Sequence, residues 1–178
     1  MSRCHSTLTD SFGRFHNYLR ISLTEKCNLR CVYCMPMEGV SLTPKNKLFT
    51  LEETKQVISL FAELGVTKLR FTGGEPTVSK HLIPLVQYSR SLPTIQSIGI
   101  TTNGILLHNQ LDALQAAGLT HVNISLDTLQ PARFAKIVRR DQKLLYKVLS
   151  TVFAAVTKGL SVKINCVVMR GVNVDELI

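Results

Sequence analysis

Three of the five cysteines in the sequence lie within one short stretch, CNLRCVYCMP, at Cys27, Cys31 and Cys34. Thiolates bind soft metal ions and iron–sulfur clusters, and a C-x-x-C pair is also typical of thiol redox chemistry. A structural zinc ion would need a fourth ligand, for which the sequence offers Cys4, His5 or Cys166. A redox pair would use Cys31 and Cys34 and would leave Cys27 without a role.

The remaining interpretation is an iron–sulfur cluster, which proteins normally hold with four cysteines. Three cysteines leave one iron open, and that iron is where a further molecule would bind. We favour this interpretation, while the spacing alone leaves zinc and the redox pair open. We expect Cys4 and Cys166 to be structural, the first near the N-terminus and the second on a strand, where a free thiol packs as a small hydrophobe.

The composition excludes several classes of protein. A chain of 178 residues with 45% hydrophobic and 19% charged residues predicts one globular domain with a sizeable core. The net charge of +9 favours anionic partners, but the basic residues are scattered without an aromatic platform, which argues against nucleic acid. No apolar run approaches the roughly 18 residues of a membrane span. The odd number of cysteines argues against a secreted disulfide framework and favours a reducing compartment.

From residue 18 onward, apolar strands alternate with amphipathic helices. Thr50 and Glu53 form a capping box before one helix, and Gly65 ends it. The predicted strands are 18–24, 66–72, 95–102, 121–127 and 161–169, and the predicted helices are 50–65, 80–91, 108–117 and 142–158. This alternation indicates an α/β fold with a parallel sheet and right-handed crossovers. We therefore divide the chain into an N-terminal extension, 1–17, and one core, 18–178.

Four polar or reactive stretches each follow a predicted strand. In a parallel α/β sheet the carboxyl ends of the strands meet at one edge, and ligands bind there. The four stretches are Cys27–Cys34, Gly73–Pro76, Thr101–Gly104 and Ser125–Asp127. The sequence therefore predicts that they form a single site.

These motifs resemble a known family when they are taken together. C-x3-C-x2-C after a first strand, with Tyr33 before the last cysteine and GGEP after the second strand, is similar to the radical S-adenosylmethionine superfamily. The wider match resembles its GTP 3′,8-cyclase family of molybdenum cofactor biosynthesis, through LTDSFGRFHNYLRISLTEKCNLRCVYCMP, KLRFTGGEP, ITTNG, NISLDTL and VKINCVVMRGVN. The resemblance runs from about residue 8 to the end. It implies a partial (β/α) TIM-like barrel of about five βα units.

The resemblance implies a role for each matching residue. Cys27, Cys31 and Cys34 would hold a [4Fe-4S] cluster whose open iron binds S-adenosylmethionine. Further contacts to S-adenosylmethionine are implied for Tyr33, Gly74 and Ser125. Contacts to GTP are implied for Arg20, Arg70, Thr101 and Lys163, and guanidinium and ammonium groups suit phosphate oxygens. Without the resemblance, each of these residues also fits an ordinary place on a strand face, in a turn or at a cap.

The resemblance also implies a reaction and its partners. A 5′-deoxyadenosyl radical would take the hydrogen from C3′ of GTP, and the C3′ radical would attack C8 of the guanine to give 3′,8-cyclo-7,8-dihydro-GTP. The cofactors carry this chemistry while the protein orients and shields them. An electron donor, a pathway continuing at cyclic pyranopterin monophosphate synthase, and a homodimer are further expectations. The compartment would be the mitochondrial matrix in a eukaryote and otherwise the cytoplasm.

The sequence departs from the family at its end. The family binds a second [4Fe-4S] cluster through a C-terminal extension that this sequence does not encode, so we expect a truncated form with a half-built GTP site. The last strand, 161–169, would lie at an open sheet edge. A non-catalytic form that binds the cluster or partners is therefore the main competing function. Two further candidate functions are a radical enzyme with another substrate and a zinc-stabilised nucleic-acid module.

Overall fold

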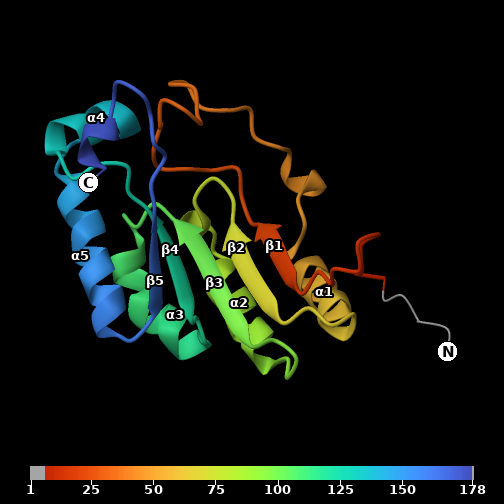
Figure 1. Ribbon diagram of the computed structural model, residues 1–178. Helices are drawn as coiled ribbons and strands as arrows, with labels where there is room; N and C mark the ends of the chain where they lie inside the picture. Colours follow the sequence, from red (N-terminus) through yellow and green to blue (C-terminus); the bar gives the residue numbers. More distant parts are fainter. Residues whose placement is uncertain (1–6, 178) are drawn as a thin grey trace.

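The computed structural model describes residues 7–177, and the predictions on Cys4 and His5 therefore lie outside the described residues. Five parallel strands form one sheet in the order β1-β2-β3-β4-β5 (Figure 1). The strands are β1 Tyr18–Ser22, β2 Lys68–Thr72, β3 Ser97–Thr102, β4 His121–Ser125 and β5 Ser161–Asn165. The predicted α/β class and parallel sheet are confirmed.

The helices connect consecutive strands and are α1 Leu51–Glu63, α2 Leu82–Ser91, α3 Leu111–Ala117, α4 Pro131–Val138 and α5 Leu144–Thr157. Short 3-10 turns are η1 Lys45–Lys47, η2 Pro76–Val78, η3 Leu107–Gln110 and η4 Val174–Glu176. The capping box at Thr50 and Glu53 is confirmed. Helix α4 was not predicted, although it starts with a proline and buries Phe134, Ile137 and Val138. No helix within residues 7–177 combines the length and apolar character needed to cross a bilayer.

Successive side chains of a strand point to opposite faces of the sheet, and here the two faces differ sharply. The apolar face packs against α1, α2, α3 and α5 (Figure 1). The core between them includes Phe71, Ile100 and Ile124, all fully buried. The opposite face, here called the polar face, carries the alternate residues of each strand. In strand order these are Tyr18, Arg20, Ser22, Lys68, Arg70, Thr72, Ser97, Gly99, Thr101, His121, Asn123, Ser125, Ser161, Lys163 and Asn165.

Strand β5 lies at one edge of the sheet, as predicted, and pairs with β4. It ends at Asn165, four residues before the end predicted from the apolar run. The backbone amide of Val167 donates to Asp127 Oδ1 at 2.9 Å instead of continuing the ladder. Cys166 follows the strand and is exposed, so the prediction that it packs on a strand as a small hydrophobe is wrong.

Candidate functional site

A cavity of about 220 Å³ lies at the carboxyl ends of the strands. Residues from all four predicted stretches line it, which confirms that they meet at one edge of the sheet. The lining residues are Cys27, Leu29, Cys31, Tyr33, Cys34, Thr72, Gly73, Gly74, Glu75, Thr101, Thr102, Asn103, Ser125, Asp127, Thr128, Phe134, Ile137 and Val138. The predicted cluster ligands, the three predicted S-adenosylmethionine contacts and Thr101 are therefore brought together.

The three cysteines are close enough to affect one another electrostatically. Burial raises the pKa of Cys27, and it raises the pKa of Cys31 to about 12, while the neighbouring thiols act in the same direction. Cys34 is exposed at the rim of the cavity. The amide of Leu29 donates to Cys27 Sγ at 3.4 Å, so a donor already faces a sulfur atom that would carry negative charge as a ligand.

The three thiols line one cavity, an arrangement that an iron–sulfur cluster can use. Within residues 7–177, no group of three or more His, Cys, Asp or Glu side chains surrounds one point closely enough to hold a metal ion. A cluster binds each thiolate through a different iron, so its cysteines can line a cavity without converging on one point.

The cysteine loop, residues 27–36, is fastened to the end of α4. The amide of Arg30 donates to Val138 O at 3.1 Å, and the amide of Val32 donates to Ile137 O at 2.9 Å. The Arg30 guanidinium donates back to Cys27 O at 2.9 Å, within the loop itself. The last carbonyl groups of a helix have no hydrogen-bond partner inside the helix. The two loop amides supply those partners, and the same hydrogen bonds hold the loop in place. Sequence reasoning missed this support because it missed α4.

The two glycines after β2 allow residues 24–26, just before the cysteine loop, to cross very close to them. The amide of Gly74 donates to Thr24 O at 2.6 Å. A Cβ on Gly74 would lie 2.5 Å from Lys26 O, and one on Gly73 would lie 2.4 Å from Thr24 O. Both contacts are far inside van der Waals range, so only glycine fits at either position. The contact of Gly74 with S-adenosylmethionine stays a prediction, and the structure adds this second reason for glycine.

The predicted GTP contacts divide into two groups. Thr101 lines the cavity, whereas Arg20, Arg70 and Lys163 extend from the polar face of the sheet beside it. Arg20 pairs in register with Arg70, and Lys163 pairs with Asn123, which in turn pairs with Thr101. Their alignment makes one continuous polar surface that leads to the cavity.

This polar surface is electropositive. Burial lowers the pKa of His121, and the charges of Arg70, Lys163 and Lys68 lower it further. None of the five strands within residues 7–177 contains an aspartate or glutamate. A cationic surface whose strands carry no acidic side chain attracts an anion such as a polyphosphate.

The fold and the cavity define a class of protein: a parallel α/β sheet with three cysteines and a glycine pair at its carboxyl edge. The chain matches the radical SAM superfamily over residues 21–178. It therefore belongs to the radical SAM superfamily. Streptococcus suis SuiB bound to S-adenosylmethionine has the same fold, with a TM-score of 0.66 at 19% identity over 84% of this chain and 32% of SuiB.

Two sequence relatives are more similar. Molybdenum cofactor biosynthesis protein 1 of Drosophila melanogaster is 55% identical over 98% of this chain and 31% of its own length. The mitochondrial GTP 3′,8-cyclase of Arabidopsis thaliana is 50% identical over 96% of this chain and 43% of its own length. The chain thus spans less than half of either relative.

Proposed function

We propose that this chain is the cluster- and S-adenosylmethionine-binding part of a GTP 3′,8-cyclase acting in molybdenum cofactor biosynthesis. The observation that carries the proposal is the meeting of three cysteines, a glycine pair and Ser125 in one cavity beside a cationic surface. The name of the Arabidopsis relative supports GTP as the substrate, and the name of the Drosophila relative supports the pathway. The reaction would join C3′ of GTP to C8 of its guanine.

Different residues of the chain would bind the cluster, S-adenosylmethionine and GTP. Cys27, Cys31 and Cys34 would hold a [4Fe-4S] cluster, and Tyr33, Gly74 and Ser125 would contact S-adenosylmethionine in the same cavity. When bound, these two cofactors supply one-electron chemistry. Arg20, Arg70, Thr101 and Lys163 would hold GTP, with the cationic groups on its phosphates.

The test is reconstitution of the 178-residue chain with iron and sulfide without oxygen. We expect a brown protein with the iron and sulfide content of a [4Fe-4S] cluster, and 5′-deoxyadenosine after addition of reductant and S-adenosylmethionine. Changing Cys27, Cys31 and Cys34 together to Ser should abolish both. The matched control is Cys166→Ser, which changes an exposed cysteine outside the cavity and should leave both intact. A colourless wild-type protein would contradict the proposal.

One observation favours a second function, cofactor binding without turnover of GTP. Arg20 and Lys163 are exposed, whereas radical chemistry needs a site that excludes water. Adding GTP to the reconstituted chain separates the two functions by mass spectrometry. Formation of the 3′,8-cyclised nucleotide supports the cyclase, and 5′-deoxyadenosine without that product supports the non-catalytic form.

A further inference from the structure

Asp127 joins two segments that are far apart in the sequence. It lies two residues beyond β4 and is 8% exposed. Its Oδ2 accepts a hydrogen bond from the Tyr33 hydroxyl at 2.8 Å, and its Oδ1 accepts one from the Val167 amide at 2.9 Å. One carboxylate thus holds both the cysteine loop and the segment after β5, residues 166–177, here called the C-terminal segment.

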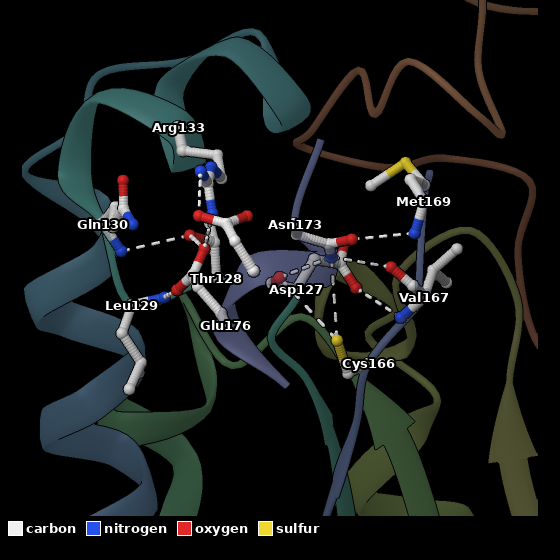
Figure 2. A network of polar contacts seen from close by, with 11 residues as sticks. Asp127, Thr128, Leu129, Gln130, Arg133, Cys166, Val167, Met169, Asn173 and Glu176 are labelled. Atoms are coloured by element: carbon white, nitrogen blue, oxygen red, sulfur yellow. Dashed lines mark hydrogen bonds and ion pairs between the residues drawn. The ribbon is translucent and has the colours of Figure 1, made fainter. Parts of the chain in front are cut away.

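The C-terminal segment folds so that the side-chain amide of Asn173 reaches the backbone carbonyl of Asp127. Asn173 is 1% exposed, and its Oδ1 accepts from the Met169 amide at 2.7 Å (Figure 2). Its Nδ2 donates to Asp127 O at 2.7 Å and to Val167 O at 2.9 Å. The side chain therefore closes a turn and fastens that turn to the backbone of Asp127.

The partners of Asp127 indicate a geometric role. Within residues 7–177 the Asp127 carboxylate forms no ion pair, and its partners are a hydroxyl and an amide. Tyr33 stands between Cys31 and Cys34, in the turn where the Cys34 amide donates to Cys31 O at 3.1 Å. Fixing the Tyr33 side chain therefore restricts the turn that spaces these two thiols.

We propose that Asp127 is a positioning residue that couples the conformation of the cysteine loop to that of the C-terminal segment. The importance of this coupling for cofactor binding rests on the proposed function. The coupling itself belongs to the chain without cofactors, and it can be measured there. Two hydrogen bonds to one carboxylate act as a unit, because losing the first frees the carboxylate to move away from the second.

The C-terminal segment has a second attachment that provides a control. Glu176 accepts hydrogen bonds from Thr128 Oγ1 at 2.5 Å and from the Leu129 amide at 2.8 Å, and it pairs with Arg133 of α4 (Figure 2). No hydrogen bond within residues 7–177 links Glu176 to the cysteine loop. A change at Glu176 should therefore loosen the segment without touching Tyr33 or Asp127.

The first test is hydrogen–deuterium exchange, resolved by residue, on the cluster-free chain. Tyr33→Phe removes only the hydroxyl, and we expect it to speed exchange of the Val167 amide about tenfold, the equivalent of one lost hydrogen bond to a charged group. Asp127→Ala should speed exchange at Val167 and at Cys34 alike. Glu176→Ala should speed exchange at Leu129 and leave Cys34 unchanged.

Asp127→Asn separates positioning from a general loss of structure. Its amide oxygen can accept from Val167 and its NH2 group can donate to the Tyr33 oxygen, so slow exchange should return at both places. Unchanged exchange at Val167 in Tyr33→Phe would overturn the coupling. That variant keeps the ring and changes a half-exposed side chain, so it tests the proposal even if Asp127→Ala does not fold.

The second test uses reconstituted protein and the electron paramagnetic resonance signal of its reduced cluster. The concentration of S-adenosylmethionine that half-changes the signal should rise about tenfold in Asp127→Ala and stay within about threefold of wild type in Asp127→Asn. Equal affinities in wild type and Asp127→Ala would overturn the positioning role. Failure of the wild type to bind a cluster would refute the proposed function and leave the exchange result standing.

Discussion

The Glu75 carboxylate joins the loops that follow β2 and β3, because its Oε2 accepts a hydrogen bond from the backbone amide of Asn103 at 2.7 Å. Its Oε1 accepts from the hydroxyls of Thr102 and Thr77, each at 2.6 Å. Glu75 is 1% exposed, so these bonds replace water entirely. Every partner donates, and an ionised carboxylate is the side chain that only accepts.

We therefore predict that Glu75→Gln destabilises the fold, because the NH2 group of glutamine would face donors and leave at least one of them without an acceptor. The free energy of unfolding in urea should fall by about 2–3 kcal/mol. Glu63→Gln is the matched control, since Glu63 is exposed at the end of α1 and should change stability by less than about 0.5 kcal/mol. Equal effects of the two changes would contradict this role of Glu75.

Gly74→Ala tests the close crossing of residues 24–26, just before the cysteine loop, over the end of β2. The new methyl group would lie 2.5 Å from Lys26 O and 2.6 Å from Glu25 O, and both are backbone atoms that cannot rotate away. We expect a loss of at least about 3 kcal/mol in the free energy of unfolding, measured in urea on the cluster-free chain.

Gly159→Ala is the control for Gly74→Ala. Gly159 has φ +74°, and a Cβ there would meet nothing within 4 Å. Its cost is therefore backbone strain alone, about 1–2 kcal/mol. If Gly74→Ala cost no more than Gly159→Ala, the crossing would be looser than the structure describes.

The sequence predicted the sheet well because its signals were local. Alternating apolar residues marked the strands, and the capping box at Thr50 marked the start of α1 to within a residue. Helix α4 escaped because it has only eight residues and no side-chain N-cap, although Pro131 and the spacing of Phe134, Ile137 and Val138 could have indicated it. The end of β5 depends on a bond from Val167 to Asp127, which no local pattern encodes.

The candidate site also has features that the sequence predicts and features that it does not. The four loops could be placed together because parallel strands align their carboxyl ends, and the cysteine spacing is visible in the sequence. The connections between the loops could not be predicted, since Glu75 with Asn103 and Asp127 with Tyr33 pair across long sequence separations. Each of these residues has an ordinary local explanation until the fold places its partner.

His121 should report on the charge of the polar face. Its folded pKa is lowered from the ordinary value of 6.5, first by burial and then by Arg70, Lys163 and Lys68. Below pH 6.5 the unfolded chain therefore binds a proton that the folded chain resists, so this contribution to stability is present above pH 6.5 and is lost as the pH falls through the folded pKa. Stability at acidic pH should decline less steeply in His121→Gln than in wild type.

A proton NMR titration of the His121 ring checks the cause. Arg70→Gln should raise the pKa of His121 toward 6.5, because among the three neighbouring charges Arg70 has the largest effect on the protonated ring. Lys158→Gln is the control, since Lys158 pairs with Asp112 and lies outside the polar face. An unchanged pKa in Arg70→Gln would show that the charge of Arg70 does not contribute to the lowering.

Inorganic triphosphate should bind the polar face through Lys163 in particular. Lys163 is exposed on β5 and lies in register beside Asn123, which pairs in turn with Thr101 at the cavity. Its ammonium group can therefore meet a phosphate beside the cavity. Replacing it by Gln removes one point charge, and we expect the dissociation constant from calorimetry to rise about tenfold in dilute buffer. Lys158→Gln removes the same charge elsewhere and should have little effect. The difference between the two variants should shrink as salt screens the interaction, whereas a difference that persists in about 1 M salt would mean that Lys163 acts through packing and not through charge.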